Sequence, residues 1–85
     1  YEQSIIDLSV YIDHFPNAAP EIYNRGLSYT NLGKDKEALA DFSRSIEIDP
    51  KFVRAYRARG NTYLKLGDIE KGNADLEIYK QLGGQ

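Results

Sequence analysis

The sequence predicts an all-α fold, a solenoid of antiparallel helix pairs with about five helices. The first observation is a set of short patterns that return after 34 residues, the period of a helix–turn–helix repeat. The second is apolar spacing of three and four residues, which is typical of amphipathic helices. The third is a proline or glycine near the expected helix boundaries. The returning residues are Arg25-Gly26 with Arg59-Gly60, Tyr29, Leu32 and Gly33 with Tyr63, Leu66 and Gly67, and Ala40-Asp41 with Ala74-Asp75.

Residues 1–14 are predicted to form the first helix, because apolar side chains follow one another at helical spacing. This stripe consists of Tyr1, Ile5, Leu8 and Ile12. Ile6 and Val10 widen it toward a second face, which indicates neighbours on both sides. Pro16 ends the helix, since proline disfavours helical geometry at the residue before it. In the 34-residue register this segment is expected to be the second helix of a repeat whose first helix is missing.

Two complete helix pairs are expected to follow. Their helices are residues 20–32 with 34–48, and residues 52–66 with 69–82. Pro20 opens the first of them, where a missing N–H costs nothing, and Gly33 and Gly67 act as stops. Asp68 is a good N-cap for the last helix. The chain is thus expected to be a single domain, divided into residues 1–18, 19–52 and 53–85.

Gly26 lies in the middle of a predicted helix, where glycine costs about 1 kcal/mol relative to alanine. We expect a packing reason, namely the close approach of the following helix. Small Ala38 is expected to face Gly26 at this crossing, while Phe42 fills the space beside it. In the last repeat Gly72 takes the position of Ala38, which keeps the crossing tight.

The pattern of the first complete repeat resembles the tetratricopeptide repeat family. It consists of Ile22, Arg25, Gly26, Tyr29, Ala38, Phe42 and Pro50. The resemblance covers essentially the whole chain and implies a right-handed solenoid that binds other proteins. The chain departs from the family pattern at Arg25 and Arg59, where the family has leucine, and at Tyr79, where it has alanine. The larger Tyr79 is expected to hinder the stacking of another ordinary repeat.

Composition narrows the functional classes. A net charge of -2 with 28% charged residues provides no global field that favours nucleic acid or an anionic membrane. The absence of cysteine excludes disulfides and thiol catalysis. No apolar run approaches the roughly 18 residues of a membrane-spanning helix, so membrane insertion is not expected. The chain begins with Tyr1 rather than Met, which indicates a piece of a longer protein.

No catalytic residue, metal site or cofactor is expected, because the sequence shows no nucleophile–base pair, metal-ligand cluster or phosphate-binding loop. His14 lies at a helix end, where a cation suits the dipole, and is expected to have a capping or surface role. Gly83-Gly84-Gln85 resembles the tripeptide that peptide-release factors use. Because three-residue motifs often arise by chance, we assign it no function.

Charged residues are expected on solvated helix faces, since acidic and basic residues alternate along them. The acidic residues are Asp35, Glu37, Asp41, Asp68, Glu70, Asp75 and Glu77, and the basic ones are Lys36, Arg44, Lys71 and Lys80. A purely basic run between Lys51 and Lys65 contains Tyr56 and Tyr63, a combination that RNA-binding helices use. Both tyrosines fall on the apolar stripe and are expected to be buried, which argues against nucleic acid as a partner.

In the family, the first helices of the repeats line a concave groove, and the face opposite the apolar stripe contacts bound peptides. The resemblance implies these binding residues: Tyr23, Leu27, Thr30 and Asn31 in one repeat, and Arg54, Arg57, Asn61 and Lys65, with Leu64, in the next. Some family members clamp a C-terminal carboxylate with lysine and asparagine side chains. Asn24 and Arg54 match two clamp positions, but Ala58 replaces a required cation, which argues against a true clamp.

Two functional hypotheses follow. The first is a protein–protein interaction scaffold that binds a protein or peptide in the groove, with acidic or C-terminal segments favoured by its cations. The alternative is a self-associating structural module, a homo-oligomer that stacks through the open ends of the solenoid. Sedimentation across concentration separates the two. An enzyme is the weakest alternative, because no site chemistry can be assigned.

Overall fold

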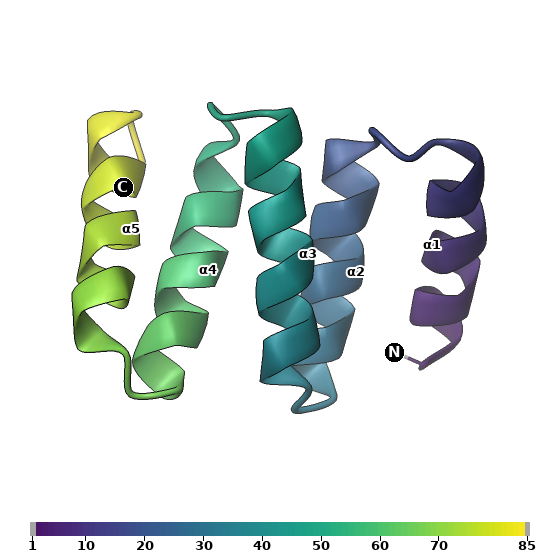
Figure 1. Ribbon diagram of the computed structural model, residues 1–85, viewed down its shortest axis with the longest axis horizontal. Coiled ribbons are helices and arrows are strands. Elements are labelled where there is room, and N and C mark those ends of the chain that lie inside the picture. The colour runs from purple at the N-terminus through teal and green to yellow at the C-terminus, as the bar shows by residue number, and fades with distance from the viewer. Residues whose placement is uncertain (1, 85) are drawn as a thin grey trace.

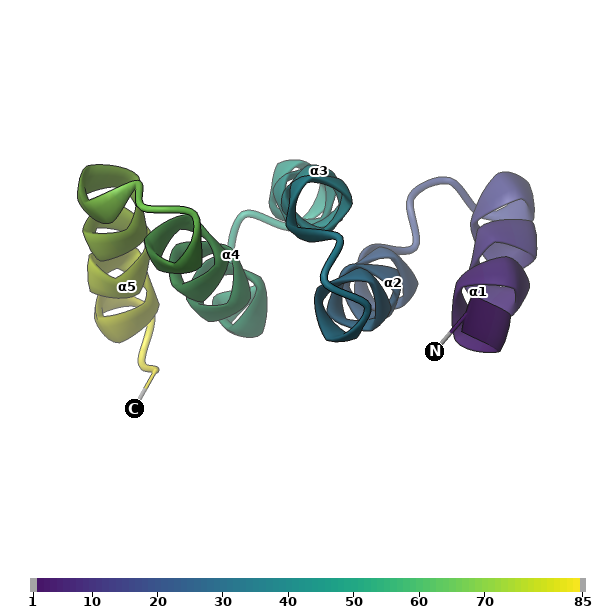
Figure 2. The ribbon, with the colours of Figure 1, turned by 90° about the horizontal axis from the view of Figure 1, so that it is seen from below.

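The computed structural model describes residues 2–84, and within that range the chain folds into five helices in a zigzag row (Figure 1). They are α1 (Glu2–His14), α2 (Ala19–Asn31), α3 (Asp35–Ile48), α4 (Val53–Lys65) and α5 (Ile69–Gln81). Successive helices are antiparallel, and α3 is displaced from the line of α2 and α4 (Figure 2). The predicted all-α solenoid is confirmed. Tyr1, expected on the first apolar stripe, and Gln85, the end of the Gly-Gly-Gln motif, lie outside the described residues.

The helix boundaries lie at the proline, glycine and aspartate residues that predicted them. Pro20 lies in the first turn of α2, where a missing N–H leaves no helical hydrogen bond unmade. After α2 and α4, Gly33 (φ 76°) and Gly67 (φ 88°) adopt the left-handed conformation that ends a helix. The Asp68 carboxylate caps α5 by accepting a 3.3 Å hydrogen bond from the backbone N–H of Lys71.

The core lies between α2 and α3 and continues between α3 and α4. Its largest fully buried side chains are Phe42, Ile22 and Ser45. A further cluster consists of Ala19, Ile46, Phe52, Ala55 and Tyr56. The Tyr56 hydroxyl donates to the carbonyl of Pro50 at 2.9 Å, which satisfies its polar end. Tyr63, by contrast, is only half-buried, so the expectation that both tyrosines are buried is correct for Tyr56 alone.

Gly26 allows α2 and α3 to approach closely. A Cβ atom at this position would lie 2.6 Å from the Phe42 ring and 3.2 Å from the Asp41 Cβ atom. Phe42, rather than the expected Ala38, therefore provides the nearest atoms. In the last repeat the expected tight crossing at Gly72 is confirmed, because a Cβ atom there would lie 3.0 Å from the carbonyl oxygen of Gly60.

A buried ion pair joins α2 to α3. The Arg25 guanidinium donates to both carboxylate oxygens of Asp41, with Nε–Oδ2 and Nη2–Oδ1 distances of 2.8 and 2.7 Å. Its Nη1 reaches the hydroxyl of Ser9 on α1 at 3.2 Å. The hydrogen bond that Arg25 donates to Asp41 raises the pKa of the Arg25 guanidinium. The Asp41 side chain is 7% exposed, so the expectation that it lies on a solvated surface is wrong.

The same arrangement returns one repeat later. Arg59 donates to Asp75 at 2.7 and 2.8 Å, and its third donor reaches Ser43 of α3 at 3.3 Å. Asp75 is also buried, so the expectation that it lies on a solvated surface is wrong as well. A carboxylate can be buried here because a two-pronged, charge-assisted hydrogen bond replaces its hydration. Each arginine thus ties its own helix to the second helix of its repeat and to that of the preceding repeat.

Candidate peptide-binding groove

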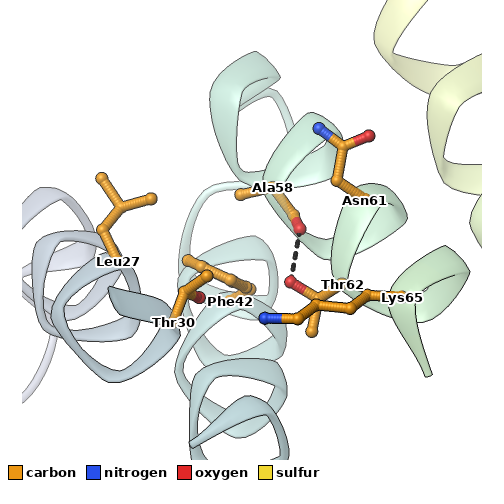
Figure 3. A pocket seen from close by; sticks show the side chains of 7 residues that line it. All are labelled: Leu27, Thr30, Phe42, Ala58, Asn61, Thr62 and Lys65. Carbon is orange, nitrogen blue, oxygen red and sulfur yellow. Dashed lines mark hydrogen bonds between the residues drawn. The ribbon is translucent and has the colours of Figure 1, made fainter. Parts of the chain in front are cut away.

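A groove runs between α2 and α4, with α3 at its floor (Figure 3). One part is a cleft of about 210 Å³, lined by Leu27, Thr30, Phe42, Ala58, Asn61, Thr62 and Lys65. Leu27 and Thr30 project from α2 on one side, and Ala58, Asn61 and Lys65 from α4 on the other. The Thr30 hydroxyl is satisfied by the carbonyl of Gly26 at 3.1 Å.

A second cleft of about 280 Å³ continues the groove. It is lined by Tyr23, Leu27, Arg54, Arg57, Ala58, Asn61 and Tyr79. The two clefts share Leu27, Ala58 and Asn61, so they form one uninterrupted surface.

Aromatic rings hold the first arginine of the groove. The Tyr23 ring packs against Phe42 and Phe52, with ring centroids 5.8 and 5.1 Å apart. The Arg54 guanidinium lies 5.5 Å from the centroid of Tyr23 and 5.4 Å from that of Phe52. These cation–π contacts restrict Arg54 while leaving its N–H groups open to another ligand.

The second arginine is held in a similar way from the opposite side. The Arg57 guanidinium lies 5.8 Å from the centroid of the Tyr79 ring on α5. Within the described residues, neither Arg54 nor Arg57 forms an ion pair. The groove therefore presents two positioned positive charges.

Lys65 differs from these arginines. Its ammonium group forms a 3.3 Å ion pair with Asp35 at the start of α3, and the Asp35 side chain is only 15% exposed. The expectation that Asp35 lies on a solvated surface is therefore wrong, and Lys65 lines the groove while already paired with an acidic side chain. Lys65 also lines the smaller cleft, whereas Asp35 does not.

Two further expected positions lie elsewhere. Asn31, at the end of α2, is exposed and lines neither cleft. Leu64 packs toward Gly72 of α5, where a Cβ atom would meet its side chain at 2.6 Å, and it also lines neither cleft. The other candidates, Tyr23, Leu27, Thr30, Arg54, Arg57, Asn61 and Lys65, line at least one of the two.

Four lining residues were not among the predicted binding residues: Phe42, Ala58, Thr62 and Tyr79. Phe42 and Tyr79 belong to second helices, whereas the predicted residues all lie on first helices, on the face opposite the apolar stripe. Thr62 is buried, and its hydroxyl donates to the Ala58 carbonyl at 2.8 Å. Ala58, where a carboxylate clamp would need a cation, lies in both clefts, so the middle of the groove is apolar.

Nowhere in residues 2–84 do three histidine or acidic side chains gather as a metal site would require. None of the helices there combines the length and hydropathy needed to cross a bilayer.

Stacked helix pairs tied by repeating contacts around an open groove define a class of protein, the helical-repeat scaffold. Residues 26–67 match the family model of the TPR repeat. The chain belongs to the tetratricopeptide repeat family, as its sequence pattern predicts.

Curated relatives are much longer proteins. Hsp70-Hsp90 organizing protein 3 of Arabidopsis thaliana is 30% identical over 81 residues, which is 95% of this chain and 14% of that protein. DnaJ homolog subfamily C member 7 of Mus musculus is 39% identical over 57 residues, 67% of this chain and 12% of the relative. Serine/threonine-protein phosphatase 5 of Homo sapiens is 32% identical over 77 residues, 91% and 15% respectively. The match to this enzyme lies in its tetratricopeptide repeats.

Solved structures share the architecture. A crystal structure of MamA superposes with a TM-score of 0.89 at 26% identity, covering 92% of this chain and 46% of that one. Another MamA structure has a TM-score of 0.91 at 21% identity, covering 96% and 48%, and shows the fold alone. With the family and its relatives, this fold makes the chain a protein–protein interaction module.

Proposed function

We propose that the groove between α2 and α4 binds a peptide segment of a partner protein that carries at least one acidic group. The observation that supports this proposal is the continuity of the two clefts through Leu27, Ala58 and Asn61, with arginines along one part. Peptide and ligand sites typically combine an apolar lining with a few well-placed polar groups.

The middle of the groove suits an apolar side chain of the ligand. Leu27 is 37% exposed, a large value for a leucine within a helical array. It faces Ala58 across the groove, and Phe42 closes the floor between them (Figure 3). Covering Leu27 with a ligand side chain would remove apolar surface from water.

The arginines suit a carboxylate. Arg54 and Arg57 both line the larger cleft, and each is held over an aromatic ring. A guanidinium that stacks through its face still offers its edge to a carboxylate as a two-pronged donor. Asn61 is exposed and lines both clefts, so its amide can donate to or accept from a peptide backbone.

The groove should bind weakly and in a salt-dependent way. Its clefts of about 210 and 280 Å³ cover only a few ligand side chains. Exposed cations mainly supply steering and specificity rather than affinity. We expect a dissociation constant on the order of micromolar or weaker, which rises as added salt screens the arginines.

The test compares two fluorescent peptides that differ only by aspartate or asparagine next to a leucine. We expect the chain to prefer the aspartate peptide and Arg57→Glu to abolish that preference, because the reversed charge repels the carboxylate. Arg44→Glu is the matched control, since Arg44 is exposed on α3 and lines neither cleft. Equal losses from the two variants would mean that general charge attraction, not the groove, governs binding.

Self-association through the ends of the solenoid was the alternative hypothesis. The outer face of α5 disfavours it at that end. One repeat earlier, Ser43 bonds to Arg59 and Ile46 packs in the core, but the corresponding residues of α5 are Glu77 and Lys80, which are both exposed. A polar outer face is the usual property of a terminal helix in a repeat array.

A further inference from the structure

The larger cleft of the groove carries more positive charge than a single carboxylate balances. Arg54 and Arg57 lie three residues apart on α4, and both line this cleft of about 280 Å³. Residues at that spacing share one face of a helix. Among the described residues that line the cleft there is no aspartate or glutamate. The cleft therefore presents two positive charges on one face of α4, without an acidic neighbour to offset them.

The other basic side chains of α4 are already neutralised within the fold. Arg59 donates to both carboxylate oxygens of Asp75, at 2.7 and 2.8 Å. Lys65, in the last turn, pairs with Asp35 at 3.3 Å. Of the four basic residues of this helix, the two arginines of the cleft are thus the ones without an ion pair in the described part of the chain.

Aromatic rings from two different helices hold these arginines in place. The Arg54 guanidinium lies 5.5 Å from the ring centroid of Tyr23, on α2, and 5.4 Å from that of Phe52. The Arg57 guanidinium lies 5.8 Å from the ring centroid of Tyr79, on α5. A guanidinium held through its face keeps N–H donors at its edge. Side chains that are restricted before binding lose less conformational entropy when a ligand arrives.

The position of this charge is unfavourable for the fold itself. Arg54 is the second residue of α4, near the end of the helix that carries the positive partial charge of the dipole. The first turns of α1, α2, α3 and α5 each contain an acidic residue, whereas the first turn of α4 contains none. Departures of this kind from what stabilises a helix are expected where residues serve binding. An anionic ligand would offset the excess charge.

We infer that the larger cleft binds a phosphorylated residue of the partner segment, with its phosphate received jointly by Arg54 and Arg57, hereafter the arginine pair. A phosphomonoester carries a charge of about −1.5 to −2 at neutral pH and offers three strong acceptor oxygens. Each guanidinium can donate two parallel hydrogen bonds to such an anion. The arginine pair therefore matches a phosphate in both charge and donors. This inference rests on the proposed function, because it names the acidic group that the groove prefers.

The rest of the groove favours a peptide, rather than nucleic acid, as the carrier of the phosphate. Leu27 and Ala58 line the cleft together with the arginine pair, and Lys65 farther along is already paired with Asp35. Nucleic acid carries a phosphate at every nucleotide and is bound by many cations. This groove instead combines one doubly positive position with an apolar one. A segment with a single phosphate and a neighbouring apolar side chain fits that combination.

Phosphorylation of the partner would then control binding. An unmodified serine offers the arginine pair no charge, and the small clefts of the groove supply little affinity by apolar contact alone. Adding the phosphate supplies charge-assisted hydrogen bonds to two arginines at once. The groove is thus expected to discriminate strongly between the modified and the unmodified form of one segment.

The test uses three fluorescent peptides that differ at one position next to a leucine, which is serine, aspartate or phosphoserine. Each is titrated with the full 85-residue chain and followed by fluorescence anisotropy. We expect the phosphoserine peptide to bind about tenfold more tightly than the aspartate peptide, because the second arginine gains charge-assisted hydrogen bonds. The aspartate peptide should in turn bind more tightly than the serine peptide.

Single substitutions separate the two charges. Arg54→Gln and Arg57→Gln each leave one guanidinium, which is enough for aspartate, so the preference for aspartate over serine should remain. The preference for phosphoserine over aspartate should disappear in both. Arg44→Gln is the matched control, since Arg44 is exposed on α3 and lines neither cleft. Arg54→Lys keeps the charge but not the two-pronged donor and should retain only part of the phosphoserine preference. Circular dichroism checks that each variant is folded.

The possible failures are distinct. Equal binding of the phosphoserine and aspartate peptides, with the serine peptide weaker, would overturn this inference and leave the proposed function standing. Equal binding of all three peptides would overturn both. An equal loss of phosphopeptide binding from Arg44→Gln would show that general charge attraction replaces the arginine pair. Displacement of the phosphopeptide by an equal concentration of inorganic phosphate, or of a single-stranded oligonucleotide, would identify a bare anion or nucleic acid as the ligand and overturn the inference.

Discussion

Arg25 and Arg59 stand where the family pattern has leucine, and each holds a buried aspartate in the second helix of its repeat. The long arginine stem can pack as leucine does, while the guanidinium reaches a partner that leucine cannot. The Arg25 and Arg59 side chains are 23% and 20% exposed, so water still reaches part of each pair. These pairs specify how the helices are aligned, because the two-pronged geometry admits little sliding.

Replacing the carboxylate should destabilise the fold. In Asp41→Ala the Arg25 guanidinium would remain partly buried without its partner, which costs about 3 kcal/mol at the lower end of measured values for broken buried pairs. For a chain of this size that is a fall in the melting temperature of roughly 12 °C or more. Thermal unfolding by circular dichroism measures it, with exposed Asp13→Ala as the control. An Asp41→Ala protein that melts at the wild-type temperature would contradict the role of the pair.

These pairs could have been found in the sequence only by comparing the two repeats. Arg25 and Asp41 are 16 residues apart, so a search for charges spaced by one helical turn does not connect them. Both residues return in the next repeat, which was the available signal. Lys65 and Asp35 lack even this signal, because the residues in their positions elsewhere are Asn31 and Ile69.

At the scale of helices, close approach outweighs intrinsic helix propensity in α5. Gly72 lies inside the helix, where alanine would be better by about 1 kcal/mol if only propensity mattered. A Cβ atom there would lie 2.6 Å from the side chain of Leu64 and 3.0 Å from the carbonyl oxygen of Gly60. Leu64 can change its rotamer, but the backbone of α4 cannot move without disturbing the pair between Arg59 and Asp75.

We therefore expect Gly72→Ala to destabilise the protein by up to about 2 kcal/mol, the usual cost of overpacking after the gain in propensity is subtracted. Urea unfolding measures the change. Ala74→Gly, on the exposed side of the same helix, reports the intrinsic difference between the two residues. A Gly72→Ala protein that is more stable than the wild type would show that α4 and α5 can separate at little cost.

The helices could be predicted well because proline, glycine and apolar spacing all return with the same period. The bounds of α2 to α5 lie within one residue of those expected. The groove was harder, because its residues were selected by helix face alone. That criterion selected Leu27 and Asn61 but omitted Phe42, which reaches the floor from α3 through the space left by Gly26.

At the scale of the whole molecule, charge and packing change along the row of helices. The groove carries arginines from the basic helix α4, whereas α1 carries only acidic charges apart from His14. The attraction for an acidic segment is therefore expected to come from the α4 side of the molecule.

The packing predicts that local unfolding costs less free energy in some helices than in others. None of the residues of α1 is buried, whereas α3 buries Ala38, Asp41, Phe42, Ser45 and Ile46. In a solenoid each helix is stabilised by its immediate neighbours, so one held mainly on a single side opens at lower cost. We expect the amides of α1 to exchange with deuterium much faster than those of α3 in NMR experiments on the native protein.

The hydrogen bonds between arginine and serine make this prediction specific. The Arg25 guanidinium holds α1 through the hydroxyl of Ser9, so Ser9→Ala should speed exchange in α1 while leaving α3 nearly unchanged. Ser43→Ala removes the equivalent bond to Arg59 and should affect the contact between α3 and α4 instead. Equal protection of α1 and α3 in the native protein would mean that the chain opens only as one unit.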